Sequence, residues 1–550
     1  MIKKITKSAK SCRLYLALAL MSSGWCFAQT TSKSPIYDRK ENELIEKRDL
    51  FSKHFLNQDG TYAVAIASGP IHYGKSGAYL DIDHTIRPAA ASGYAYANKE
   101  NLMESYFGAT AHQGIKSKTQ EGEVLEFLET TMHWEVNGLK INERPSANVA
   151  FTAQGNKGYY NGLYEAIDAE FVVLNGKRKL NYHLTQPAAI ADAPAHATYL
   201  VFTEKVKIPA NWSYASTENG LVINDDKQQQ IYLYGHPFSY DGGGKKIRCG
   251  NTLMTVSAQG NTLTIATKVK ADWLLAADRI FPITVDPTVM VYPTAANYHT
   301  GSVFSSDYLK ETATIGFGRF DDNNGVEDFL RGWARFNTAS LPEDAVIANG
   351  VTVNFYISGG SEDYAPANGH ELVFSKLTLD PVTATGSALY DAIGQFGYGP
   401  FVTAAINSIG WKAHTLTSAT LQNDIANSLA ANYFSIGFMP QGDFFAGEYL
   451  IADGWDANDP YLTFTYTQPL GVASFSQSAI KVYPNPVENS LHIDAPFEIE
   501  SIRVYSMLGQ LVQSVNAQNT IDVSALARGI YSVEIKDKNQ QTILRKIVKK

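Results

Sequence analysis

The sequence predicts an all-β protein, and three observations lead to that prediction. The chain is rich in aromatic residues that favour strands, with 31 Tyr and 26 Phe. Short runs of Tyr, Val, Ile, Phe and Thr are separated by Gly, Asn, Asp and Pro turns, and few windows show helical periodicity. Alternation along these runs places one face in a core and one in water. We therefore expect two β-sandwich regions of jelly-roll-like form, followed by a small immunoglobulin-like β-sandwich.

Residues 1–28 have the pattern of a cleaved secretory signal. Cations at positions 3, 4, 7, 10 and 13 precede the apolar run 14–21, and small residues lead to a cleavage site between Ala28 and Gln29. The run is far shorter than the roughly 20 residues that cross a bilayer. Trp25 before Cys26 disfavours lipid attachment. We expect export through the Sec machinery and no transmembrane segment in the mature chain.

Charge and cysteine usage narrow the class of protein further. Removing residues 1–28, which hold five cations and no acid, takes the net charge from −8 to −13. From residue 470 onward nine Lys and Arg face seven Asp and Glu, which gives +2 there and −15 for residues 29–469. Nucleic acid is therefore not an expected partner, because phosphate binding needs a basic face. Cys249 alone remains in the mature chain, so no internal disulfide is possible.

Residues 29–60 are the next element, and we predict a short helical segment there. Within 38–56, Leu44, Ile45 and Phe51 or Phe55 recur at a spacing of three to four among charged residues. From residue 61 onward the pattern becomes that of strands. A hairpin turn is predicted at Asn175-Gly176. The clearest strand segments are 61–67, 169–174, 179–185, 198–204, 230–235 and 262–269.

The segment 273–288 reads WLLAADRIFPITVDPT and marks a boundary. Its prolines, Pro282 and Pro287, lack backbone donors, so we expect them to end a strand and its pairing. The segment resembles the ending of a β-sandwich region found in large secreted and cell-wall proteins, often ahead of DNRLRE-type or Rhs-type modules. That resemblance implies one sandwich region over 61–290.

Residues 330–342 (LRGWARFNTASLP) lead into 345–356 (AVIANGVTVNFY), and 461–466 (YLTFTY) read as a closing strand. This resembles the signature of DNRLRE-type jelly-roll modules, which are similar to carbohydrate-binding modules. Asn337 and Asn349-Gly350 depart from the family pattern. The resemblance implies a second module over 291–468, with a linker over 469–478.

Side chains suited to catalysis or metal binding do not form a recognisable set. We find no zinc-protease, nucleophile-elbow, P-loop or Rossmann motif. The pairs Asp81/Asp83 and Asp168/Glu170 each place two acids on one strand face, which a glycosidase needs but which is also common on solvated strands. We therefore predict no catalytic residue, no cofactor and no firm metal site.

Two acidic loops, 321–328 and 453–459, offer the oxygen ligands that calcium prefers, although each also reads as an ordinary polar turn. Four aromatic residues are candidates for stacking on sugar rings. Among them we expect Trp333 in the core and Trp455 at the surface. The other two are Trp411 and Tyr364.

The segment 479–550 carries four motif blocks in order. These are VYPNPV at 482–487, the strand and turn 502–512 around Gly509, the run 521–535, and the basic segment 544–550. Together they closely resemble the type A sorting domain of Bacteroidota type IX secretion cargo. The residues that carry the resemblance are Tyr483, Pro484, Asn485, Pro486, Gly509, Asp522, Leu526, Gly529, Tyr531 and Lys546.

The resemblance implies secretion through the periplasm to the medium or the outer cell surface, with the type IX translocon as partner. For the body, residues 29–468, we favour a noncatalytic role in adhesion or polysaccharide binding. The alternative is a secreted hydrolase, a glycosidase or peptidase, whose catalytic acids cannot be selected from the sequence.

Overall fold

The computed structural model describes residues 41–89, 93–217, 220–243, 252–291, 299–312, 314–321, 327–361, 363–401, 406–454, 458–468, 480–495, 497–507, 509–538 and 542–550. The predicted signal peptide with its Ala28–Gln29 cleavage site and the predicted linker 469–478 lie outside these ranges. In the described part of the chain, no helix is both long and apolar enough to cross a membrane.

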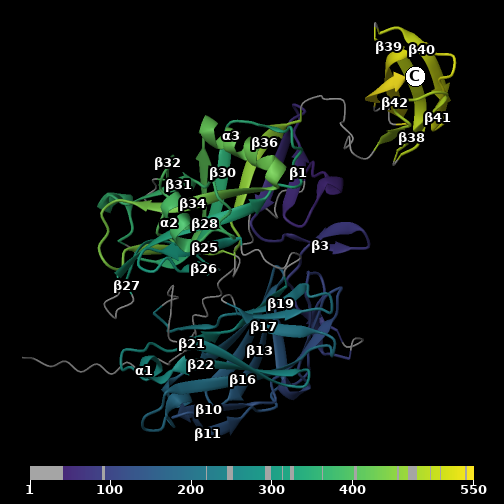
Figure 1. Cartoon of the computed structure of the whole chain (residues 1–550). Coiled ribbons are helices and arrows are strands. Elements are labelled where there is room, and N and C mark those ends of the chain that lie inside the picture. Colours follow the sequence, from purple (N-terminus) through teal and green to yellow (C-terminus); the bar gives the residue numbers. More distant parts are fainter. Residues whose placement is uncertain are drawn as a thin grey trace, which may run out of the picture.

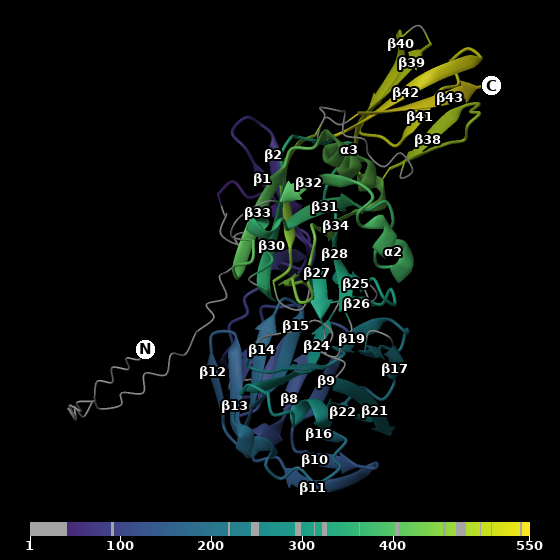
Figure 2. The same cartoon turned by 90° about the vertical axis from the view of Figure 1, so that its left-hand side faces the viewer.

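The fold is all-β, as predicted, and is built from two large sandwiches and a small one (Figures 1 and 2). The first large sandwich consists of two ten-stranded antiparallel sheets. One sheet holds β5 (Arg87–Pro88), β6 (Tyr96–Asn98), β7 (Glu104–Phe107), β8 (Ile115–Lys118), β9 (Glu123–Phe127), β10 (Thr131–Val136), β11 (Leu139–Pro145), β16 (Tyr199–Lys207), β21 (Thr252–Gln259) and β22 (Thr262–Lys270). The other holds β12 (Phe151–Gln154), β13 (Lys157–Tyr164), β14 (Ile167–Leu174), β15 (Lys177–Leu184), β17 (Ser213–Thr217), β18 (Gly220–Asn224), β19 (Gln230–Gly235), β20 (Phe238–Tyr240), β23 (Ile283–Asp286) and β24 (Thr288–Val291).

The six strand segments predicted from alternation all form strands, namely β2, β14, β15, β16, β19 and β22. The Asn175-Gly176 hairpin is also confirmed, because Leu174 pairs with Lys177 and Gly176 has a φ of 61°. One detail of the predicted boundary is wrong. Pro287 interrupts the strand but does not end the pairing, since β24 follows it and also pairs with β15. The Pro287 carbonyl still accepts a hydrogen bond from the Leu180 amide at 3.0 Å.

A buried polar cluster joins the two sheets of the first sandwich. Arg178 of β15 donates to Glu126 of β9, and Ser117 and Tyr234 donate to the same carboxylate at 3.1 and 3.0 Å. Arg178 also lies over the ring of Phe171. Glu204 of β16 is buried nearby, where burial and the charge of Glu126 raise its pKa to about 8, against the opposing effect of Arg178. We therefore expect the stability of the sandwich to depend on pH.

The stability of the body should fall as pH rises from 6.5 to 8. The pKa of Glu204 is ordinarily 4.5 and about 8 here, so over that span the folded chain keeps a proton that the unfolded chain releases. The cost is about 1.4 kcal/mol per pH unit for one group. Below pH 6.5 the opposite trend operates, because burial lowers the pKa of His54 and His72 to about 4 and that of His299 to about 3. These imidazoles stay neutral in the fold, so acid favours the unfolded chain.

Urea unfolding at pH 5.5, 6.5 and 8 measures this dependence, and we expect the greatest stability near pH 6.5. The Glu204→Gln variant should lose the decline between pH 6.5 and 8, while keeping the decline on the acid side. An unchanged slope in that variant would contradict the assignment to Glu204.

The second large sandwich is a fourteen-stranded sheet that folds back around one core. It contains β1 (Ser52–Leu56), β2 (Tyr62–Ala67), β25 (Thr300–Phe304), β26 (Lys310–Thr312), β27 (Ile315–Asp321), β28 (Glu327–Asn337), β29 (Val346–Ile347), β30 (Val351–Gly360), β31 (Glu371–Lys376), β32 (Gly397–Phe401), β33 (Gly410–Leu416), β34 (Tyr433–Gln441), β35 (Tyr449–Ala452) and β36 (Tyr461–Thr467). Outside the large sheets lie the hairpin β3 (His72–Lys75) and β4 (Ala78–Asp81), the helices α1 (Ala271–Leu274), α2 (Gly386–Ala392) and α3 (Ala419–Ser428), and the short 3-10 helices η2 (Ile45–Lys47), η4 (Ala111–Gln113), η5 (Pro187–Ile190), η6 (Pro366–Asn368) and η7 (Leu429–Ala431).

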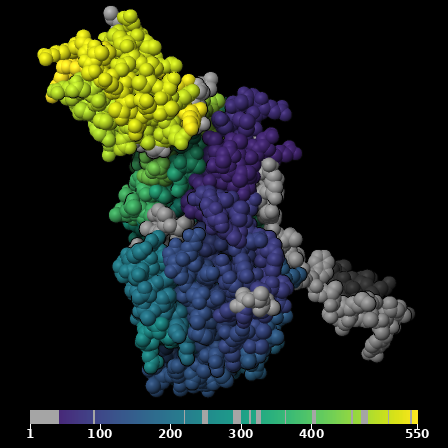
Figure 3. Space-filling view, turned by 90° about the vertical axis from the view of Figure 1, so that its right-hand side faces the viewer, coloured from purple at the N-terminus to yellow at the C-terminus, as the bar shows by residue number. Residues whose placement is uncertain are grey.

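The N-terminal segment does not form the predicted helix, because its residues complete this second sandwich. Within 41–56 the structure has only η2 and then the strand β1, which pairs with β2. β2 in turn pairs with β36, so the first two strands of the body belong to the same sheet as its last strand. In Figure 3 the purple N-terminal segment lies against the green second sandwich. The first sandwich is thus inserted into the second, and the predicted contiguous ranges 61–290 and 291–468 do not separate them.

The two large sandwiches share a buried interface. Val222 and Leu233 of the first form one apolar cluster with Val303, Trp333 and α2 of the second. Beside it, Lys177 Nζ lies 3.6 Å from Asp459 Oδ2, with both side chains almost fully buried. The Asp459 carboxylate occupies the space where a Cβ on Gly69 would lie. The body is therefore one packed unit.

The third sandwich has a core and sheets of its own. Its three-stranded sheet contains β37 (Lys481–Tyr483), β38 (Ser490–Asp494) and β41 (Thr520–Asp522). Its four-stranded sheet contains β39 (Ile499–Ser506), β40 (Leu511–Asn516), β42 (Gly529–Asp537) and β43 (Thr542–Lys549). The apolar core between them includes only residues from 480 onward.

Candidate binding groove and sorting domain

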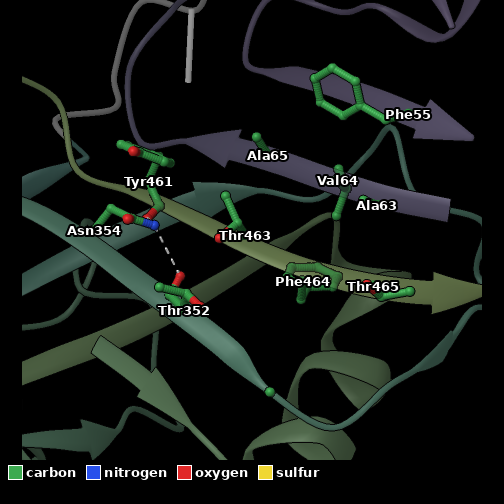
Figure 4. A pocket seen from close by; sticks show the side chains of 11 residues that line it. Phe55, Ala63, Val64, Ala65, Thr352, Asn354, Tyr461, Thr463, Phe464 and Thr465 are labelled. Carbon is green, nitrogen blue, oxygen red and sulfur yellow. Dashed lines mark hydrogen bonds between the residues drawn. The ribbon is translucent and has the colours of Figure 1, made fainter. Parts of the chain in front are cut away.

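A groove of about 360 Å³ lies on the outer face of the second sandwich, over β2, β36 and β30 (Figure 4). Cross-strand pairing explains its lining, because Ala65, Thr463 and Thr352 are direct partners across the three strands. The side chains of Ala63 and Ala65 on β2 are small and leave space over this face. Hydroxyl groups from the neighbouring strands β36 and β30 line that space. The eleven lining residues are Phe55, Ala63, Val64, Ala65, Gly350, Thr352, Asn354, Tyr461, Thr463, Phe464 and Thr465.

Polar groups in the groove are neutral and arranged in a row. Thr352 Oγ1 is 2.8 Å from Thr415 Oγ1 on the neighbouring β33. The Asn354 amide donates weakly to the Thr352 and Tyr461 carbonyls, at 3.4 and 3.3 Å. None of the lining residues is an acid or a base. The groove therefore offers hydroxyl and amide hydrogen bonds without attracting charged ligands.

Tyr461 lines the groove, and its ring contacts Trp411, which lies outside the lining. Trp411 makes edge contacts with Tyr356 and Tyr461, at centroid distances of 5.6 and 5.5 Å. Trp411 is half-buried, so part of its surface faces solvent. Trp333 packs in the interior as predicted, and Tyr364 also belongs to the core. Trp455 lies outside the described residues.

The acidic pairs singled out in the sequence are held by cations or amides. Asp81 binds Lys53 at 2.6 Å and Arg48 at 3.1 Å, and Asp83 binds Arg87 at 2.5 Å. Asp168 accepts from the Gly162 amide at 2.6 Å. Neither Asp81/Asp83 nor Asp168/Glu170 lines the groove.

Glu170 belongs to a hydrogen-bonded series on the outer face of the first sandwich. His183 lies 3.2 Å from Glu170 through Nε2 and 3.0 Å from Thr284 Oγ1 through Nδ1. Burial alone would raise the pKa of Glu170, but hydrogen bonds from His183, Lys157 and Asn181 outweigh it and lower the pKa to about 2. The order hydroxyl, imidazole, carboxylate is that of a nucleophile with its base. Thr284, however, is only 5% exposed.

Calcium binding at the two acidic loops, 321–328 and 453–459, stays a prediction. Asp328 accepts hydrogen bonds from the amides and hydroxyls of Ser305 and Ser306, at 2.5 to 2.9 Å. Asp453 accepts from Asn458 at 2.7 Å. Residues 322–326 and 455–457 of these loops lie outside the described ranges. Among the described residues, no group of three or more His, Cys, Asp or Glu side chains is placed to hold a metal ion.

The motif residues of segment 479–550 meet around the last strand. Asn485 accepts from the Val548 amide at 2.9 Å and donates to the Lys546 carbonyl at 3.1 Å. This asparagine is flanked by Tyr483, Pro484 and Pro486. The next residue, Val487, forms an isolated β-bridge with Lys549 of β43. The Pro-Asn-Pro motif therefore attaches the start of the domain to its last strand.

The remaining motif residues shape turns. Gly509, with a φ of 79°, lies in the turn between β39 and β40, and β42 begins at Gly529. Asp522 accepts from the Ser524 amide at 2.8 Å, which with the Ser524 hydroxyl lowers its pKa. Tyr531 donates to the Ala527 carbonyl at 2.9 Å. Leu526 packs against the domain core.

The sequence pattern did not predict the groove, although the polar residues that line it do alternate with core residues along their strands. Thr463 and Thr465 alternate with core residues along β36, as Thr352 and Asn354 do along β30. These outward positions show hydroxyls in each strand. That they face one another across neighbouring strands is a matter of long-range pairing, which local alternation does not reveal.

Comparison with known proteins covers both the body and the tail. The chain is 20% identical over 527 residues to the "tRNA3(Ser)-specific nuclease WapA" of Bacillus spizizenii and to the "tRNA nuclease WapA" of Bacillus subtilis strain 168. Each alignment covers 91% of this chain and 21% of the relative, so the chain spans about a fifth of their length. Among solved structures, a Paenibacillus xanthan lyase aligns with 91% of this chain and 56% of its own at 8% identity. The TM-score of that alignment is 0.10.

The tail gives the definite assignment. Residues 481–550 match the family described as "Secretion system C-terminal sorting domain". The match begins where β37 begins and includes all seven strands of the small sandwich. The protein is therefore cargo of the type IX secretion system, secreted or displayed on the outer surface, and its last 70 residues form the sorting domain.

Proposed function

We propose that the exported body binds a neutral polysaccharide in the groove over β2, β36 and β30, and so acts in adhesion to a glycan. The observation that carries this proposal is the uncharged lining of Thr and Asn side chains, beside Tyr461, whose ring contacts the half-buried Trp411. Sugars present hydroxyls that need hydrogen bonds and C–H faces that pack on aromatic rings. The volume of the groove lies within the range of ligand sites.

The relatives named as tRNA nucleases suggest a different ligand, which the charge of this body disfavours. Residues 29–469 carry a net charge of −15, and tRNA would be repelled by that surface. The groove residues are also neutral. A glycan fits both features better than a polyanion does.

A secreted hydrolase is the second candidate, favoured by the Thr284–His183–Glu170 series. The ionised Glu170 and a His183 that accepts from Thr284 suit acyl transfer, as in a peptidase. Against this, Thr284 is buried and Tyr240 lies within hydrogen-bonding reach of it. Peptide release from a labelled protein by the wild type, and its loss in His183→Ala, would favour the hydrolase over the binding role.

Filling the groove should abolish glycan binding while the fold stays intact. Thr463→Leu replaces a hydroxyl with a branched side chain in the middle of the groove, so we expect at least a tenfold loss of affinity. A glycan array on the purified body finds the ligand, and calorimetry on the best hit measures the loss. The matched control is Thr264→Leu, the same change on the outer side of β22, which should bind as the wild type does. Equal binding by Thr463→Leu would contradict the groove as the site.

A further inference from the structure

The sorting domain exposes a set of apolar side chains that its small size does not explain. Of the 23 large apolar residues exposed in the described chain, seven lie in this domain of about 70 residues. They are Tyr483, Met507, Leu511, Val512, Ile530, Leu544 and Val548. The domain core is complete without them, because Val533, Ile535, Ile543 and Ile547 fill its interior.

Strand register places four of these residues on one face of the four-stranded sheet. Ile530 and Val548 are direct cross-strand partners, and Leu544 lies opposite Glu534 on the same side. Leu511 lies opposite Tyr505, which faces outward beside Ser532. We call this surface the Ile530 face. Its apolar members are Tyr505, Leu511, Ile530, Leu544 and Val548, and the same register places Lys546, Ser532 and the ion pair Arg503–Glu534 on this side of the sheet.

Lys546 gives this face a positive charge within its apolar area. It lies opposite Ser532, between Leu544 and Val548 on the same side of β43. Lys546 is exposed and makes no ion pair with any described residue, whereas Arg503 and Lys536 on the same sheet lie 3.5 and 3.7 Å from acids. A partner surface that fits must be apolar and must carry an acidic group.

The Pro-Asn-Pro motif supports the role of this face. Asn485 of the Pro-Asn-Pro motif hydrogen-bonds to the backbone of Lys546 and Val548, two members of the face. These bonds fix the last strand in register, so both side chains point outward. The motif therefore holds the Ile530 face in shape, while the face is free to make contact.

We infer that the Ile530 face is the surface by which the secretion system's cargo receptor binds this domain, through an apolar contact with an acidic group against Lys546. The partner is a component of the secretion machinery because the domain matches a sorting family and shares no sheet or core with the body. The inference rests on the secretion assignment and not on the glycan groove.

Secretion of the full chain in its producing bacterium tests this inference. The triple change Ile530→Ser, Leu544→Ser and Val548→Ser, and separately Lys546→Glu, should each lower the secreted fraction at least tenfold, with accumulation in the periplasm. The control is Leu139→Ser, Leu253→Ser and Leu275→Ser, three exposed apolar residues of the body, which should be secreted normally. Thermal melts of the purified variants show that the sorting domain is still folded. Normal secretion of folded face variants would overturn the inference.

A reporter fusion distinguishes a receptor at the Ile530 face from two other binding partners, the body of this chain and a second copy of it. Residues 469–550 are joined to a periplasmic reporter, and the same face changes are made. Loss of secretion there too places the partner outside the body, as inferred. Secretion unaffected by the changes in the fusion would assign the face to the acidic body of this chain, and a concentration-dependent dimer that the changes abolish would assign it to a second copy. Either result overturns the inference, whereas secretion of a chain without residues 479–550 would instead remove the assignment beneath it.

Discussion

A chain that lacks residues 479–550 is expected to accumulate in the periplasm instead of being secreted. The sorting domain matches a secretion family, and it has its own sheets and its own core. Its removal therefore exposes no part of the body core, and the body should fold as before. Cell fractionation followed by immunoblotting measures the distribution, and we expect the secreted fraction to fall by more than tenfold.

The control for this truncation is the melting temperature of the purified body, with and without the sorting domain. Equal values show that retention follows from the missing signal and not from misfolding. The reciprocal fusion of residues 469–550 to a periplasmic reporter should gain secretion. Normal export of the truncated chain would show that another segment directs the protein across the outer membrane.

Replacing Arg178 with Met is expected to cause the largest loss of stability of any single change in the body. Arg178 and Glu126 are 2% and 6% exposed at their side chains, and Arg178 is the cation paired with this carboxylate. Without it, the Glu126 charge stays buried next to Glu204, and breaking a buried pair in this way costs about 3–5 kcal/mol. Urea unfolding of the purified body measures the change.

The double variant Glu126→Leu, Arg178→Met is the matched control for that experiment. It removes both charges and keeps the side-chain volumes similar, so its loss should be smaller than that of Arg178→Met alone. Some loss should remain, because Ser117 and Tyr234 lose their acceptor. A double variant less stable than the single one would show that the loss in Arg178→Met does not come from the unpaired Glu126 charge.

Local pattern was enough to predict the clearest strands and the sorting domain. Alternation identified β14, β15, β16, β19 and β22, because each strand has one buried face whatever its partners are. Turn residues such as Gly176 and Gly509 were predicted because only glycine readily adopts a positive φ there. The order of motif blocks in residues 479–550 identified the sorting domain, which the family match confirms.

The predicted helix over 38–56 failed for a physical reason. Its apolar residues recur at helical spacing, but the tertiary structure buries them differently. Phe55 lies in the strand β1, and Lys53 is completely buried because Asp81, from the hairpin β3–β4, neutralises it. A charged residue in a periodic pattern reads as a solvated face when its distant partner is unknown.

By itself the sequence determined the compartment, the all-β class, the positions of the clearest strands and the sorting domain, since each of these depends on residues close together along the chain. Only the tertiary structure decided that β1 and β2 close the second sandwich, that the first sandwich is inserted into it, and that Thr352 faces Thr463 to form the groove. These features arise from pairing between residues more than a hundred positions apart. Because every strand has the same backbone donors and acceptors, the choice of partner is made by the packing of the whole core and leaves no local pattern.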